Sequence, residues 1–173
     1  IDSDIIYDKD LKPVNEDDLA PLTPNDPLYS DQSNITDANI DDVWGEYTTG
    51  DGSQIVAILD TGVDYTHPDL VDNIWENIAE RDGIAGFDDD GNGYVDDIYG
   101  WDFINADNTP LDDNMHGTHV AGIVGAVGGN GKGIAGAAWN VKLMSIKVFQ
   151  SNGTGNLITI AEGITYSASN GAN

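Results

Sequence analysis

An unbroken apolar run constrains the fold of this chain more than any other feature. The run is QIVAILD at residues 54–60. A strand with one face in water alternates apolar and polar residues, whereas a strand buried on both faces does not. A second strand is predicted at residues 141–149, and helices are predicted at residues 116–128 and 156–171. Strands that alternate with helices predict an α/β fold, in which helical crossovers join the strands of a parallel sheet.

The two predicted helices differ in composition. Gly122 and Gly125 lower the helix propensity of the first, so close packing against a neighbour has to compensate. The second carries apolar residues at helical spacing, and Gly171 is its predicted stop. Its predicted buried face consists of Leu157, Ile160, Ala161, Ile164 and Ala168.

The N-terminal segment is acidic and rich in proline, which argues against a long helix. We expect an extended arm on the surface, and we divide the chain into an arm at residues 1–22 and one unit at residues 23–173. Asp26 is predicted to lie in a turn. The prolines are Pro13, Pro21, Pro24 and Pro27.

A short helix is predicted after the arm. Thr36 is the expected cap, and Ile40, Val43 and Trp44 recur on one helical face. Gly45 is expected to end the helix.

The charge balance excludes some classes of partner. The chain has 31 acidic and 6 basic residues, so its net charge is −25. Nucleic-acid binding requires a basic face, and a membrane span requires roughly 18 apolar residues in a row, so we expect neither partner. Bound cations would relieve the repulsion between these charges. Because the chain begins at Ile1 rather than at a methionine, we interpret it as a processed, mature form.

The segment DNMHGTHVAGIVGA places His116 and His119 three residues apart. Three interpretations are open: a zinc pair, two packed histidines near a helix start, or one part of a catalytic site. A zinc site needs three or four ligands. The chain offers only His67 besides this pair and has no cysteine.

Asp60 stands at the end of the first predicted strand. Active sites of open parallel sheets lie outside the carboxyl ends of the strands. An aspartate at that place can accept a hydrogen bond from the Nδ1–H of a histidine and hold the ring in one tautomer. The alternative is that Asp60 caps a turn.

An acidic insertion, FDDDGNGYVDD, occupies residues 87–97. Its spacing matches the front of a calcium-binding loop, with Gly93 at the sharp turn and oxygen ligands around it. Position 12 is Tyr99 where such a loop has glutamate, so Asp96 or Asp97 is expected to close the shell. The alternative is a solvated acidic loop. The predicted ligands are Asp88, Asp90, Asn92, the carbonyl of Tyr94, Asp96 and Asp97.

Two motifs resemble those of the subtilisin-like serine proteases, or subtilases. IVAILDTGVDYTHPDL at residues 55–70 resembles the motif of the catalytic aspartate, and HGTHVAGIVGA at residues 116–126 resembles that of the catalytic histidine. PNDPLYSDQ and NGKGIAGAAWN are most similar to the thermitase-like branch. The resemblance implies a subtilisin-like parallel sheet flanked by helices, of which this chain is the N-terminal half.

The resemblance also implies roles for the candidate residues. His116 would be the general base, and Asp60 would orient it. His119 would be a second, structural histidine that packs and forms hydrogen bonds.

The nucleophile of the family stands in a GTSMA-like motif that this chain lacks. The asparagine of the oxyanion hole is also absent. We therefore expect a C-terminal fragment of the same protease as partner, supplying the serine; a truncated chain is the alternative. In either case we expect residues 1–173 alone to be inactive.

Two further sites are implied by the resemblance. A peptide substrate or inhibitor would pair with Phe149, Gly153, Thr154, Gly155 and Leu157; an ordinary glycine turn is the alternative. A second Ca²⁺ site would consist of Asp26, Asp69, Asn130 and the carbonyls of Val127, Lys132 and Ile134. Asp69 as a simple turn residue is the alternative.

The sequence thus predicts a secreted, calcium-stabilised serine endopeptidase that binds two or more ions. Two other classes stay open: an inactive calcium-binding scaffold with the same fold, and a small calcium-binding adhesion module. A serine in the downstream motif would separate the first from the second. The third requires a chain that folds alone.

Overall fold

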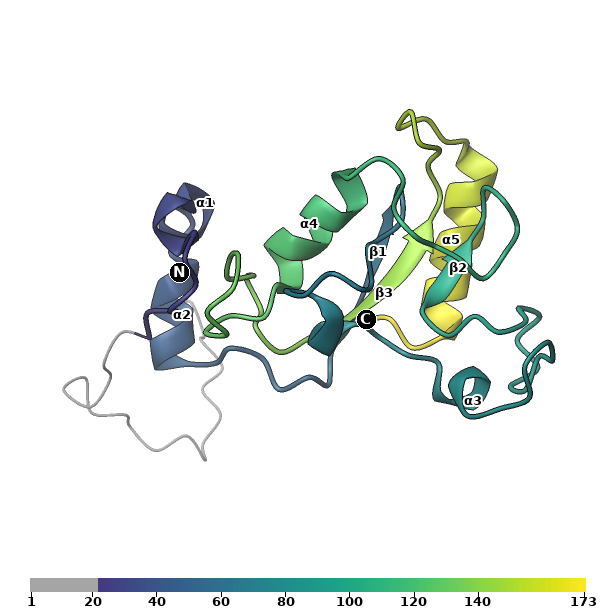
Figure 1. Ribbon diagram of the computed structural model, residues 1–173, viewed down its shortest axis with the longest axis horizontal. Helices are drawn as coiled ribbons and strands as arrows, with labels where there is room; N and C mark the ends of the chain where they lie inside the picture. Colours follow the sequence, from purple (N-terminus) through teal and green to yellow (C-terminus); the bar gives the residue numbers. More distant parts are fainter. Residues whose placement is uncertain (1–21) are drawn as a thin grey trace, which may run out of the picture.

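A three-stranded parallel sheet forms the centre of the structure (Figure 1). This computed structural model describes residues 22–173, so the arm predicted before them lies outside the described residues. The strands are β1 (Ile55–Asp60), β2 (Gly100–Asp102) and β3 (Lys142–Lys147), in the order β1-β3-β2. The α/β fold and the two longer strands are confirmed, whereas the sequence does not predict β2.

Helices flank the sheet, and none within residues 22–173 is both long and apolar enough to cross a membrane. The α-helices are α1 (Ser33–Asp37), α2 (Ile40–Glu46), α3 (Ile78–Arg81), α4 (His116–Gly125) and α5 (Leu157–Ser169), with 3₁₀ turns η2 (Tyr29–Asp31) and η3 (Val71–Asn73).

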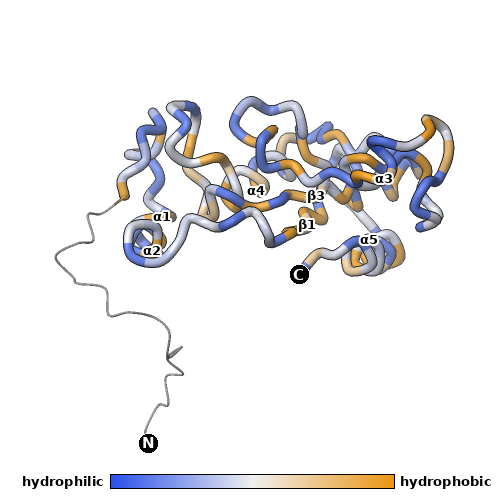
Figure 2. The backbone as a smooth tube through the Cα atoms, turned by 90° about the horizontal axis from the view of Figure 1, so that it is seen from below, coloured by the Kyte–Doolittle hydropathy of each residue, from blue (hydrophilic) through white to orange (hydrophobic). Residues whose placement is uncertain are grey.

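α4 and α5 cover opposite faces of the sheet (Figure 2). Alternate residues of β1 serve the two faces, as the period of a strand requires. Ile58 belongs to the cluster that includes Ala121 of α4. Leu59 packs against the cluster that includes Tyr166 of α5. The sheet is therefore buried on both sides, as its apolar run predicts.

The buried residues of α4 are all small, and they let the helix lie close to the sheet. A Cβ atom at Gly125 would stand 2.5 Å from Cγ1 of Val141, which is too close for any side chain. The close packing predicted for this glycine is confirmed. At Gly122 the nearest atom, from Ile134, would be 3.4 Å away, an ordinary contact.

The predicted buried face of α5 is wrong. Leu157 is 84% exposed and Ile164 is also exposed, whereas Gly163, Tyr166 and Ser167 are buried. Apolar residues surround more than one side of this helix, so their spacing alone does not show which side meets the sheet. The side with the small residue at 163 meets it, because a helix approaches a sheet most closely there. Ala161 and Ala168 are exposed as well, and Ile160 is half-buried.

The predicted short helix is two helices, α1 and α2, separated by Asn39 in the left-handed conformation (φ 54°). Thr36 lies inside α1 and does not cap it. Trp44 is buried, and its indole N–H donates to the carbonyl of Ala137 at 2.9 Å. Val43 faces solvent, so only part of the predicted apolar face is in contact.

Replacing Gly163 with Ala tests the approach of α5 to the sheet. The added methyl group would meet Cγ1 of Val148 at 2.8 Å and Cγ2 of Ile146 at 3.0 Å. We expect the free energy of unfolding to fall by about 1–3 kcal/mol, although alanine is the better helix former. Urea denaturation measures the change, with Ser169→Ala at an exposed position as control. An equal or higher stability of Gly163→Ala would contradict this packing.

Candidate functional site

Asp60 and His116 are in direct contact at the carboxyl end of the sheet. Nδ1 of the ring lies 2.7 Å from Oδ1 and 2.9 Å from Oδ2 of the carboxylate. Since a carboxylate accepts hydrogen bonds, Nδ1 carries a proton, and in the neutral ring Nε2 therefore carries the lone pair. No group in residues 22–173 forms a hydrogen bond with Nε2. The His116 side chain is 64% exposed, whereas the Asp60 side chain is 9% exposed. The site therefore presents Nε2 to solvent as a proton acceptor, while Asp60 holds the ring through Nδ1.

The contact exists because β1 ends where α4 begins. Asp60 is the last residue of the strand, and His116 is the first residue of the helix. Met115, before it, has a φ of 84°, a left-handed conformation that is uncommon outside glycine. The left-handed conformation of Met115 lets the chain enter α4 with the first helical turn facing the end of β1.

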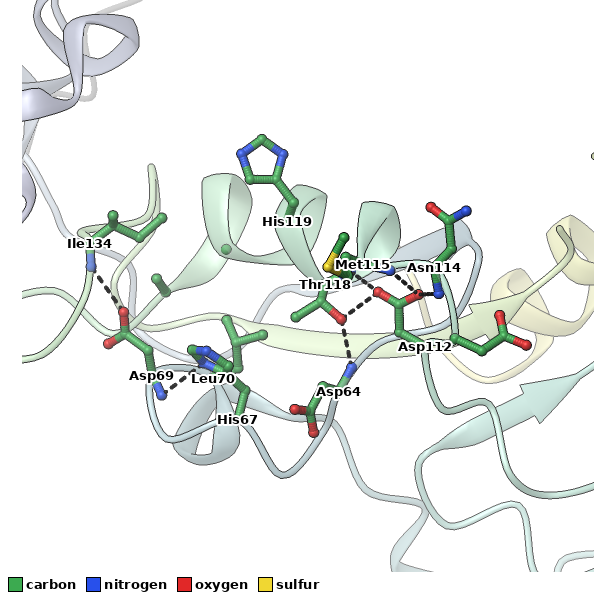
Figure 3. A pocket seen from close by; sticks show the side chains of 13 residues that line it. Asp64, His67, Asp69, Leu70, Asp112, Asn114, Met115, Thr118, His119 and Ile134 are labelled. Atoms are coloured by element: carbon green, nitrogen blue, oxygen red, sulfur yellow. Dashed lines mark hydrogen bonds between the residues drawn. The ribbon is translucent and has the colours of Figure 1, made fainter. Parts of the chain in front are cut away.

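Asp112 joins the segment after β1 to the start of α4, and Figure 3 shows its hydrogen bonds to Asn114 and Thr118. Its Oδ1 accepts from the Thr61 hydroxyl at 2.8 Å and from the backbone N–H groups of Asn114 and Met115. Its Oδ2 accepts from both the backbone N–H and the hydroxyl of Thr118, at 2.9 and 2.6 Å. Desolvation opposes ionisation, but these hydrogen bonds outweigh it and lower the pKa of Asp112. The sequence does not single out Asp112; the signal is an acidic pair just before HGTH.

The expected packing of His119 is wrong. It is exposed, points away from the sheet (Figure 3), and its ring forms no hydrogen bond with residues 22–173. It borders a pocket of about 400 Å³ between α4 and the segment that carries His67 and Asp69. Nδ1 of His67 accepts from the backbone N–H of Asp69 at 3.2 Å. Among the described residues, no group of three potential metal ligands includes a histidine, so nothing supports the zinc interpretation.

The predicted substrate segment is a closed turn in this structure. Phe149 and Gly155 form an antiparallel bridge, and the N–H of Gln150 donates to the carbonyl of Thr154 at 2.8 Å. The N–H of Gly153 donates back to the carbonyl of Gln150. These groups are paired within the turn, and their role toward a substrate stays a prediction, as does that of Leu157.

The acidic insertion gathers carboxylates from two segments. Oxygen atoms of Glu80, Asp88 and Asp90 lie within 4.8 Å of one another. Glu80 belongs to α3, is 3% exposed and also accepts from the backbone N–H groups of Asp89, Asp90 and Asp96. The sequence does not indicate it, because it lies outside the loop spacing.

Asp96 and Asp97, predicted to close this shell, are outside the carboxylate group. The Asp96 carboxylate accepts from the N–H of Gly86. Asp97 is fully buried and accepts from Asn77, Asn92 and the Tyr166 hydroxyl, while its burial raises its pKa. The third carboxylate of the group is Glu80 instead. For Asn92 and the Tyr94 carbonyl, a role as ligands stays a prediction.

The residues of the second predicted calcium site also come together. Asp26, which lies in a turn as predicted, accepts from the backbone N–H groups of Gly129 at 2.6 Å and Asn130 at 3.3 Å. The Asn130 amide donates to Oδ1 of Asp69 at 2.9 Å, and the N–H of Ile134 donates to Oδ2 at 3.0 Å. Both carboxylates are buried. Whether they and the carbonyls of Val127, Lys132 and Ile134 bind an ion stays a prediction.

Several known proteins are similar to this chain. The sequence profile of the Subtilase family matches residues 51–173. Subtilisin-like protease 1 of Plasmodium falciparum is 46% identical over 117 residues, which is 68% of this chain and 17% of that protein. Thermitase of Thermoactinomyces vulgaris is 36% identical over 151 residues, 87% of this chain and 45% of that protein. A solved structure described as proteases from Pseudoalteromonas arctica PAMC 21717 has a TM-score of 0.62 at 30% identity, and the match covers 88% of this chain and 45% of that one. This chain therefore spans less than half the length of these relatives.

Replacing Asp112 with Asn tests the network before α4. Asn keeps one acceptor oxygen, so the donors that bond to the other carboxylate oxygen lose their partner. We therefore expect the free energy of unfolding to fall by about 2 kcal/mol or more at pH 7. Because the folded-state pKa is lowered, the ionised carboxylate stabilises the fold above the unfolded pKa of about 3.9. That contribution is lost as pH falls through the folded-state pKa, so the difference between the two proteins should shrink below about pH 4.

Urea denaturation at pH 7 and pH 3 measures both effects. Asp37→Asn, at an exposed position in α1, is the matched control and should change stability by less than about 0.5 kcal/mol. A difference for Asp112→Asn that is undiminished at pH 3 would rule out ionisation as its cause.

Proposed function

The chain belongs to the subtilase family, and from this premise we propose that it supplies the aspartate and the histidine of a secreted serine endopeptidase. The observation that carries the proposal is the bond between Asp60 and Nδ1 of His116, with Nε2 directed at solvent. A base held in this tautomer is what acyl transfer by a serine requires.

In the proposed mechanism, Nε2 of His116 takes the proton of a serine hydroxyl as the oxygen attacks the peptide carbonyl. The imidazolium then returns the proton to the leaving amine. Asp60 keeps the ring in place and stabilises the positive charge that forms on it. The bond 2.7 Å long is short enough for a charge-assisted hydrogen bond.

The serine nucleophile is proposed to come from outside these 173 residues. None of the chain's serines stands in a GTSMA-like motif. Ser145, in β3, is fully buried, and its hydroxyl donates to the carbonyl of Pro110 at 2.8 Å. Because it is enclosed in this way, Ser145 is no candidate for attack on a peptide. The remaining part of the protease would also supply the oxyanion-hole asparagine.

A catalytically inactive scaffold with the same fold is the competing proposal. It keeps the carboxylate groups and the α/β core but carries another residue in place of the nucleophilic serine. Asp60 and His116 would then be a remnant. The identity of the residue in the downstream motif separates the two.

We further propose that the group of Glu80, Asp88 and Asp90 binds Ca²⁺. Three carboxylates this close repel one another unless a cation lies between them. The nearby Arg81 is engaged with Glu76 and Asp82 on the surface. Oxygen-only ligands suit Ca²⁺ better than Zn²⁺, so the residues present fit the ion. When bound, it would neutralise charge and hold α3 to the acidic loop.

His116→Ala in the protease that contains this chain tests the proposed base. We expect kcat for peptide hydrolysis to fall by at least ~100-fold, since the proton acceptor is gone. His119→Ala is the matched control, because it lies one turn along the same helix and is exposed. Its activity should be close to that of the parent. Full activity of His116→Ala, with the fold intact by circular dichroism, would refute the proposal.

Removal of calcium tests the carboxylate group. A site at about 100 times its Kd contributes roughly 2.7 kcal/mol, so chelation should lower Tm by roughly 5–10 °C. Glu80→Gln should have a lower Tm in calcium and a smaller response to chelator. Glu76→Gln, on the surface nearby, should respond to the chelator like the parent. If both variants respond equally, Glu80 is not a ligand.

A further inference from the structure

We propose that Lys147 is a positioning residue for the pair of Asp60 and His116. The inference rests on the proposed function and extends it to a residue that touches neither the ring nor a substrate. Lys147 ends β3, the central strand, where its backbone is paired with Asp60 of β1 on one side and Asp102 of β2 on the other. It therefore stands at the middle of the sheet edge that carries the site.

The ammonium group of Lys147 joins the two segments that hold the pair. Nζ donates to the carbonyl oxygen of Thr61 at 2.5 Å and to Oδ1 of Asp113 at 2.6 Å. Thr61 directly follows Asp60, and Asp113 lies three residues before His116. One cation on the central strand thus holds both the segment that follows Asp60 and the segment that precedes His116.

The burial of this cation shows that the arrangement is specific. The Lys147 side chain is 2% exposed, and no other lysine or arginine in residues 22–173 is buried. A buried ammonium is costly unless it is paired and bonded. A methionine of similar length would fill the same space without this cost. The charge is therefore useful for what it binds rather than for packing.

Lys147 performs a task that the Asp112 network does not. Asp112 ties the segment after β1 to the start of α4, but none of its hydrogen bonds to the described residues reaches β3. Lys147 ties both segments to β3. A displacement of about 1 Å at a reacting group costs on the order of 100-fold in rate. We infer that Lys147 fixes the position of Asp60 and His116 relative to the carboxyl end of β3.

The test compares Lys147→Met, Asp113→Asn and the double variant in the active protease. We expect kcat to fall about 10- to 100-fold in Lys147→Met and about 3- to 10-fold in Asp113→Asn, with KM changed by less than about twofold. The double variant should be no worse than Lys147→Met, because both remove the same tie. Lys142→Met, at the other end of β3 with its Nζ on the carbonyl of Asp72, is the matched control and should keep the parent kcat.

A second readout does not depend on activity. The Nδ1 proton of His116 gives a downfield NMR signal when it is held by Asp60, and we expect this signal to broaden or shift in Lys147→Met and Asp113→Asn but not in Lys142→Met. A purely structural role would lower Tm and leave both kcat below Tm and this signal unchanged. That result would overturn the inference.

The outcomes remain distinguishable from failure of the proposed function. If Lys147→Met does not fold, Asp113→Asn decides, since the Asp113 side chain is 51% exposed and the amide oxygen of Asn can still accept from Nζ of Lys147. If the parent protein does not hydrolyse peptides, the proposed function fails, and the NMR signal alone decides on Lys147. An unchanged signal in Asp113→Asn then contradicts the positioning role.

Discussion

The first turn of α4 lies directly on the end of β1, and the candidate catalytic pair depends on that contact. A Cβ atom at Gly117 would stand 2.0 Å from the carbonyl oxygen of Gly62 and 3.0 Å from Cβ of Asp60. Only a residue without a side chain fits there. Since the two backbones touch, the side chains of Asp60 and His116 meet without either having to leave its own element.

Hydrogen bonds to carboxylates then hold this contact in place. Asp112 accepts from Thr61, beside the strand end, and from Thr118 in the first turn of the helix. The Thr61 hydroxyl accepts in turn from the N–H of Gly117 at 3.1 Å. Lys147 adds the tie to the central strand. The site is therefore built from short segments that are each fixed by at least one ionised group, rather than by apolar packing alone.

The same use of carboxylates explains how a chain of net charge −25 forms ordered loops. Asp88 accepts from three backbone N–H groups, and Asp102 accepts from the N–H groups of Ile104 and Asn105. At a turn, an aspartate carboxylate accepts hydrogen bonds from backbone N–H groups that would otherwise bond to water. Carboxylate oxygens of Glu80, Asp88 and Asp90 lie within 4.8 Å of one another, and a cation there would reduce the repulsion between them.

The sequence by itself determined the strands β1 and β3 and the helices α4 and α5, and the resemblance of its two motifs to those of the subtilases implied the meeting of Asp60 with His116. Apolar runs, helical spacing and the convergence of parallel strand ends are local or topological signals, so they can be read along the chain. The tertiary structure alone decided which face of α5 is buried, that His119 points to solvent, and that Glu80 rather than Asp96 or Asp97 joins the carboxylate group. These three features depend on which distant part of the chain packs against each residue. A periodic pattern states which side chains are apolar or acidic, but the partner that covers or approaches them comes from a distant part of the chain.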